Sequence, residues 1–229
     1  KIDDLMPSAY EEPTDGIDFS AGSSSSGVKG KVDSGQTGFN YSNNFGMASV
    51  DIGYSPKSTN DFRGDDGQFS GIAGSEASAS ANPSSTSIAI KADVADGLMV
   101  FGGIGNKGRD SATEEFEDDH STFGLKYTMG GITAGYQHSE IDFAATTSND
   151  LETDMFGVSF QVNDDLSISY GEQDTEAETS SIEQEVSGMS VAYSMGSISI
   201  AAHANEGKNI ANQTANESTH TEISINFAF

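Results

Sequence analysis

The chain has 229 residues, of which 34% are hydrophobic, with no Trp and no Cys, and its formal net charge is -26. The lack of Cys excludes disulfides, Cys-ligated zinc and thiol chemistry, and the excess of acids disfavours nucleic acid as a partner. No uninterrupted apolar run approaches the ~20 residues of a membrane-spanning helix. If the chain crosses a membrane, we therefore expect it to do so as strands.

Residues 1–35 predict a long loop that precedes the first strand. Prolines at positions 7 and 13 and the glycine- and serine-rich stretch 20–27 interrupt every candidate element. No charged and apolar leader follows Lys1, so we expect a mature or truncated start. We divide the chain into this loop, 1–35, and a region of strands, 36–229. The loop is acidic, because it carries Asp3, Asp4, Glu11, Glu12, Asp15 and Asp18.

From Gln36 onward, apolar and polar residues alternate with a period of two, which is the pattern of β-strands. About eleven such strands are predicted, with apolar positions in the runs 39–41, 48–54, 88–94, 98–104, 123–129, 132–136, 156–162, 166–170, 189–195, 198–202 and 223–229. Tight connections are expected at 43–46, 96–97, 130–131, 163–165 and 196–197. They alternate with long polar intervals, which we interpret as loops, at 56–84, 106–120, 142–154, 172–185 and 206–218.

This alternation of short and long connections indicates a transmembrane β-barrel, because such barrels keep short turns at the periplasmic end and long loops at the outer end. The apolar faces are bulky, whereas the opposite faces carry mainly Gly, Ser, Thr, Asn and Gln. We expect these side chains to point outward, to lipid or to a neighbouring subunit: Ile88, Ile90, Phe123, Tyr127, Phe156, Phe160, Tyr193, Ile198, Ile225 and Phe227. We expect these to point to the lumen: Lys91, Lys126, Ser159, Gln161, Ser199 and Asn226.

The closing Ile225-Asn226-Phe227-Ala228-Phe229, the tight glycine turns and the acidic opening Asp3-Asp4-Leu5-Met6-Pro7 resemble the C-terminal part of Gram-negative general porins, most closely those of alphaproteobacteria. The resemblance implies an antiparallel transmembrane β-barrel of about sixteen strands, about eleven of them in this chain. It also implies an outer-membrane location, contact with outer-membrane lipid, a homotrimer, and diffusion of small hydrophilic solutes and ions. Phe227 and Phe229 would form the C-terminal strand signal.

In general porins a long acidic loop folds into the barrel and narrows it, and the resemblance assigns that role to residues 1–35. The six acids of this loop would then line the narrowest point and face cationic wall residues, for which we select Lys29, Lys31, Lys91 and Lys126. Because rings of fixed charge set ion preference, this arrangement predicts a weakly cation-selective pore. The alternative interpretation is that the six acids form an exposed linker.

The odd number of strands leaves two interpretations of how the barrel closes, since a closed antiparallel barrel needs an even number. Either strands that precede Gln36 in the complete barrel are absent from this chain, or part of residues 17–33 adds a twelfth strand to a smaller channel.

The remaining motifs are better explained without a functional site. The stretch 103–108 matches G-x-G-x-x-G, but a dinucleotide site also needs a βαβ unit. Glu117, Asp118 and Asp119 are weak candidates for a Ca²⁺ site, and a solvated loop is the preferred interpretation. The four histidines are scattered singly, and no G-x-S-x-G elbow is present, so we predict no enzyme and no cofactor other than, at most, Ca²⁺. A different class of function is a surface-exposed structural or adhesive β protein.

Overall fold

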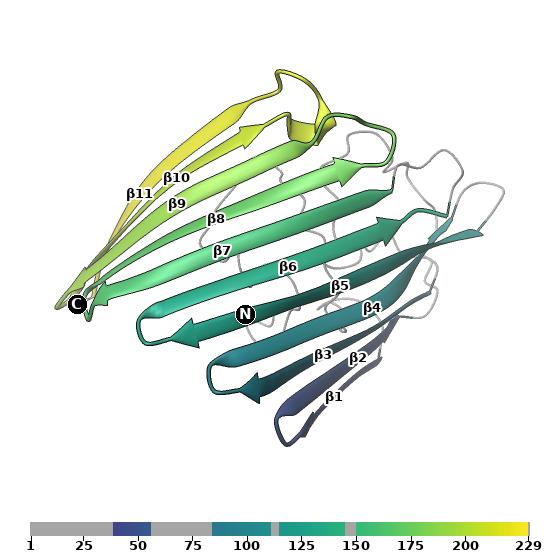
Figure 1. Cartoon of the computed structure of the whole chain (residues 1–229), viewed down its shortest axis with the longest axis horizontal. Helices are drawn as coiled ribbons and strands as arrows, with labels where there is room; N and C mark the ends of the chain where they lie inside the picture. The colour runs from purple at the N-terminus through teal and green to yellow at the C-terminus, as the bar shows by residue number, and fades with distance from the viewer. Residues whose placement is uncertain (1–38, 56–83, 111–114, 145–149, 229) are drawn as a thin grey trace.

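The computed structural model describes residues 39–55, 84–110, 115–144 and 150–228. In this part of the chain eleven antiparallel strands form one curved sheet, and each strand pairs with its neighbours in sequence (Figure 1). The strands are β1 (Phe39–Phe45), β2 (Ala48–Ser55), β3 (Ser85–Ala95), β4 (Leu98–Asp110), β5 (Glu115–Met129), β6 (Ile132–Asp142), β7 (Leu151–Asn163), β8 (Leu166–Ala177), β9 (Gln184–Met195), β10 (Ile198–Lys208) and β11 (Ser218–Phe227). The predicted all-β, antiparallel class is confirmed. No helix in the described ranges is long and apolar enough to cross a membrane.

Tight turns join the strands at one end of the sheet, and the strand ends that longer connections join lie at the other end (Figure 1). Four of these turns place a glycine at positive φ, between 61° and 72°, where a side chain would be strained. The fifth turn uses Asn163, whose side-chain oxygen accepts hydrogen bonds from the backbone N–H groups of Asp165 and Leu166 at 2.9 and 3.0 Å. The first turn lies at Gly46–Met47, later than predicted, because β1 continues through Phe45.

Several strands extend further than predicted at the end with the long connections. Most of the intervals 106–120 and 172–185 is strand, so the prediction that they are loops is wrong there, whereas strands take only the ends of 206–218. In β8, for example, Glu172, Asp174 and Glu176 continue the alternation on the same face as the apolar residues. The period of two persists, but acids replace the apolar side chains.

The strand register sorts the side chains onto two faces of the sheet. Every residue predicted to point outward lies on one face, here called the outer face, and every residue predicted to point to the lumen lies on the other, the inner face. Large apolar side chains of the outer face are exposed, as for Phe123 at 56% and Ile225 at 53%. The fully buried side chains, such as Gln137, lie on the inner face.

The inner face contains apolar residues that the sequence interpretation overlooked. One buried cluster joins Ala89 and Phe101, with Met99 packed against it, and another joins Ile141, Leu151 and Ala177, with Phe143 beside it. Both clusters are small. Within the described residues, the large apolar side chains of the outer face are exposed and do not pack into a dry interior.

A stepped boundary crosses the outer face between apolar residues and acids. Following each strand from its tight turn, the last apolar residue before the polar positions is Phe123 on β5, Phe156 on β7 and Met189 on β9. These positions are not level in the register. Phe156 pairs with Tyr136, which lies two residues nearer the tight turn than the partner of Phe123 on β6. Met189 pairs with Tyr170, which lies two residues nearer the tight turn than the partner of Phe156 on β8. The boundary therefore shifts toward the tight turns from β5 to β9, as expected where strands are tilted relative to the boundary.

Strands β1 and β11 form the two opposite edges of the sheet and do not pair with each other. The described residues therefore do not close a barrel. Residues 17–33, the alternative source of a twelfth strand, lie outside the described residues, as does the whole loop 1–35.

Candidate pore wall

Hydroxyl groups cover much of the inner face and bond to one another across neighbouring strands. Thr122 Oγ1 lies 3.0 Å from Ser139 Oγ, and Ser169 Oγ lies 2.6 Å from Ser190 Oγ. Gln137 Nε2 donates a hydrogen bond to Ser139 Oγ at 3.2 Å within the same strand. These bonds join short polar side chains of the inner face, so the surface that they form is polar.

A cross-strand row of glycines lies next to these hydroxyl groups. Gly135, Gly157, Gly171 and Gly188 pair in succession from β6 to β9, and all four are buried. Lys126 precedes this row on β5, and Asn205 follows it on β10. The inner face therefore carries no side chain at this level on four consecutive strands.

The structure places both predicted wall lysines that it describes on the inner face. Lys91 on β3 pairs with Phe101 on β4, and Lys126 on β5 pairs with Met99, so a pair of apolar side chains separates the two ammonium groups along the sheet. The same face carries the buried carboxylate of Asp51, which accepts a hydrogen bond from Ser42 Oγ at 2.5 Å. The wall thus presents both signs of charge. The six acids of the loop, with Lys29 and Lys31, lie outside the described residues.

Two histidines predicted to be isolated are brought together on the inner face of β10 and β11. His203 pairs with Glu222, and Asn205 pairs with His220 in the adjacent position. His220 Nε2 lies 3.6 Å from Glu222 Oε2. Asn205 is buried, and neither its amide nitrogen nor its oxygen has a hydrogen-bond partner among the described residues. The sequence shows only that these polar residues stand two positions apart within each strand and so share a face. The strand register is needed to show which of them lie opposite each other.

The weak Ca²⁺ candidates do not form a single group. Asp118 is buried on the inner face, whereas its neighbour Asp119 is exposed on the outer face, because successive residues of a strand point to opposite sides. The side chain of Glu117 lies outside the described part. Within the described residues, no three His, Cys, Asp or Glu side chains are grouped so that they could hold a metal ion.

The outer face carries an acid belt above the stepped boundary, formed by Asp119, Glu140, Asp142, Glu152, Asp154, Glu172, Asp174, Glu176, Glu185 and Glu206. The tyrosines beneath the belt bond to it, since the Tyr136 hydroxyl donates to Asp154 and the Tyr170 hydroxyl donates to Glu172. Lys208 Nζ lies 3.9 Å from carboxylate oxygens of both Glu185 and Glu206. These contacts join the apolar surface to the charged one.

The acid belt also affects the pKa of a residue in the connection between β8 and β9. Burial raises the pKa of the Glu183 carboxyl, and the neighbouring carboxylates of Glu176, Glu185 and Asp154 raise this pKa further. The acids therefore repel one another at this end of the sheet.

No family model matches the chain, and no curated protein matches it. Solved porin structures do match its fold. The anion-selective porin from Comamonas acidovorans is 13% identical with a TM-score of 0.64, over 83% of this chain and 58% of that one. A porin refined at 1.8 Å is 12% identical with a TM-score of 0.60, over 83% and 60%. OmpF of Salmonella typhi, in complex with daunomycin, is 10% identical with a TM-score of 0.59, over 82% and 60%.

The chain spans 58% to 60% of the length of these three porins. At such low identity the likeness concerns the fold, and it agrees with the sheet topology and with the two contrasting faces described above. The described part of the chain has the fold of a porin barrel wall.

Proposed function

We propose that this chain forms part of the wall of a water-filled channel in the bacterial outer membrane, through which small hydrophilic solutes and ions diffuse passively. The observation that carries the proposal is the distribution of side chains, with bulky apolar residues exposed on the outer face and short polar residues on the inner face. Such a distribution suits a sheet with lipid outside and water inside.

A soluble structural or adhesive protein fits this distribution less well. Its sheet would bury the apolar face against a second layer, whereas here Phe123, Phe156 and Ile225 are each about half exposed. An enzymatic function is supported less well than either, because the channel interpretation accounts for the inner-face hydroxyl groups without a catalytic role. If the chain proves monodisperse in buffer without detergent, the channel proposal is wrong.

The complete channel in this proposal is a homotrimer of barrels of about sixteen strands, surrounded by outer-membrane lipid. The partial coverage of the matched porins supports a barrel larger than eleven strands. Phe227, exposed at 58% on the outer face of the last strand, suits the proposed role in a C-terminal strand signal. A twelve-stranded channel closed by residues 17–33 is the alternative.

The channel is weakly cation-selective in this proposal, and the charges that reach the lumen set the preference. The acid belt lies on the outer face, so the wall separates its carboxylates from the solution inside. Selectivity then depends on Asp3, Asp4, Glu11, Glu12, Asp15 and Asp18, opposed by Lys29, Lys31, Lys91 and Lys126.

Reversal potentials in a KCl gradient across planar bilayers test this proposal. We expect a weak preference for K⁺ that diminishes near 1 M salt, where the Debye length is ~3 Å. Changing the six loop acids to Asn or Gln should shift the reversal potential toward Cl⁻. Changing Lys91→Gln and Lys126→Gln should shift it toward K⁺.

A matched control is the pair Glu172→Gln and Glu176→Gln in the acid belt, which should leave the reversal potential nearly unchanged. A Cl⁻ preference in the unmodified pore would refute cation selectivity. A larger effect of the belt pair than of the lysine pair would show that inner-face charges do not set the preference.

A further inference from the structure

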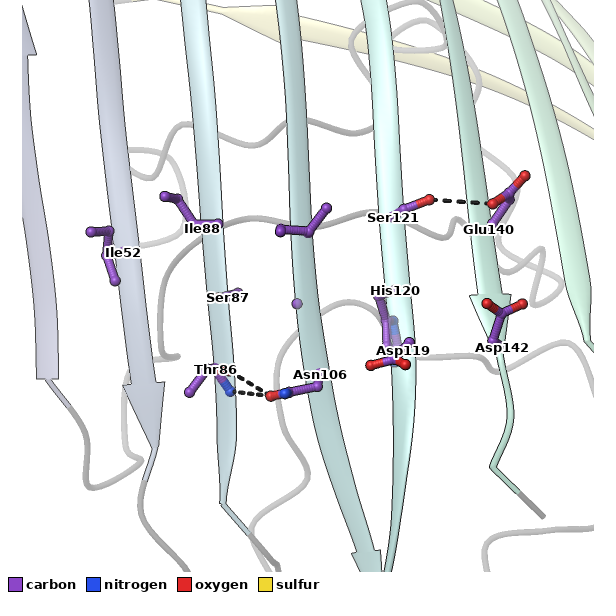
Figure 2. A pocket seen from close by; sticks show the side chains of 12 residues that line it. Ile52, Thr86, Ser87, Ile88, Asn106, Asp119, His120, Ser121, Glu140 and Asp142 are labelled. Atoms are coloured by element: carbon purple, nitrogen blue, oxygen red, sulfur yellow. Dashed lines mark hydrogen bonds between the residues drawn. The ribbon is translucent and has the colours of Figure 1, made fainter.

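A groove of about 490 Å³ lies on the outer face of strands β2 to β6, where the apolar surface meets the acid belt (Figure 2). We call it the boundary groove. Its apolar part is formed by Ile52, Ile88 and Ile104, which pair in one cross-strand row. The same row continues into Ser121, whose small side chain leaves the hollow open, and then into Glu140.

The rim toward the long connections is acidic. Asp119 and Asp142 stand directly opposite each other in the register, and with Glu140 they place three carboxylates at one end of the groove. Like charges at directly opposed positions destabilise a sheet. Among the described residues no Lys or Arg lines the groove, so no ammonium or guanidinium group of the described part offsets these carboxylates there.

The neutral polar side chains of the groove leave this imbalance in place. Thr86 donates its hydroxyl to Asn106 Oδ1 at 2.5 Å and its backbone N–H to the same oxygen at 3.1 Å. Ser121 Oγ donates to Glu140 Oε2 at 3.5 Å (Figure 2). A ligand that complements the groove would therefore combine an apolar body with a positively charged hydrogen-bond donor.

We propose that the boundary groove binds a membrane lipid whose head group carries a primary ammonium, with an acyl chain along the three isoleucines and the ammonium between the carboxylates of Asp119, Glu140 and Asp142. The inference rests on the membrane location in the proposed function, but not on conduction or selectivity. The charge complementarity selects this lipid over an anionic one, whose phosphate would meet three carboxylates.

The head group decides the binding preference, because lipid tails are as apolar as isoleucine and transfer of a tail from bulk lipid into the groove changes little. A primary ammonium offers three N–H donors to carboxylate oxygens, whereas a quaternary ammonium offers none. The groove should therefore distinguish lipids that share tails and differ only in their heads.

Native mass spectrometry of the detergent-purified, delipidated protein tests the proposal, with phosphatidylethanolamine, phosphatidylcholine and phosphatidylglycerol of identical tails added in turn. We expect phosphatidylethanolamine to be retained best. The pair Asp119→Asn and Asp142→Asn should reduce its retention about five- to tenfold. The matched control Glu172→Gln with Glu176→Gln removes two belt charges away from the groove and should leave retention unchanged.

A second variant keeps the test valid if the acid pair impairs folding. Ile104→Phe should fill the groove and reduce retention, whereas Ile168→Phe, on the outer face of β8, should not. Equal retention of all three lipids, or equal loss in the acid pair and its control, would overturn the proposal. Retention of phosphatidylglycerol that depends on Ca²⁺ would also overturn it, in favour of a cation-bridged anionic lipid.

A second copy of the chain is the other conceivable occupant. Because the chain has no Cys, the single variant Ile104→Cys reports on this directly. Disulfide-linked dimers of this variant in native membranes would assign the groove to a subunit contact and overturn lipid binding. Bilayer conductance of the same preparations separates the two proposals, since loss of lipid retention with normal conductance refutes only the lipid site.

Discussion

Gly124 shows how closely the inner face is packed around a single aromatic residue. A Cβ at this position would lie 2.4 Å from Cζ of Phe101 and 2.5 Å from the backbone oxygen of Tyr136. The ring could turn aside, but the oxygen belongs to a paired strand. We expect Gly124→Ala to destabilise the barrel by roughly 1–3 kcal/mol. The midpoint of thermal unfolding in detergent, followed by the change in electrophoretic mobility, measures this effect.

The variant Gly124→Ala with Phe101→Leu serves as the control. It removes the clash with the ring and keeps the clash with the oxygen, so stability should be recovered only in part. Unfolding of Gly124→Ala at the unmodified temperature would contradict the packing described for this site.

At the scale of the strand, neighbouring residues should respond in opposite ways to the same substitution. Phe160 of β7 points outward within the apolar surface, whereas Ser159 points to the inner face and is exposed. Phe160→Arg places a charge in the hydrocarbon and should cost roughly 2–4 kcal/mol, if the residue lies near the bilayer midplane. Ser159→Arg should cost far less, because its charge remains in water. Urea unfolding in lipid vesicles compares the two, and equal costs would refute the assignment of faces.

At the scale of the whole molecule, the open edges of the sheet predict which strands can be cross-linked. Ala202→Cys with Ile223→Cys should form a disulfide, since these residues pair between β10 and β11. Tyr41→Cys with Ile223→Cys should not, because β1 and β11 are opposite edges. Gel mobility of oxidised protein in native membranes gives the result. A disulfide between β1 and β11 would mean that these two strands close the barrel alone.

The same assay addresses the twelve-stranded alternative. Single cysteines placed along 28–32, each combined with Ile225→Cys, should remain unlinked if β11 pairs with a strand outside this chain. A disulfide at alternate positions of that stretch would instead support the smaller channel.

The sequence was sufficient to predict the strands, their faces and most turns, because each depends on the local alternation of apolar and polar residues. It failed where acids replaced apolar residues at the same period, as at Glu172 and Asp174, since no apolar signal marks such a strand. It also failed for the surroundings of Phe101, His203 and His220. These surroundings depend on the register between strands, which the alternation within one strand does not contain.

The stepped boundary has a consequence for folding. If β7 were displaced by two residues toward the tight turns relative to β6, every side chain would keep its face, but Asp154 would take the place of Phe156 beside Tyr136. A carboxylate would then enter the hydrocarbon, at a cost that rises with depth. The opposite displacement would lift Phe156 into the head groups. In the proposed membrane location, the bilayer would thereby favour the correct strand register during insertion.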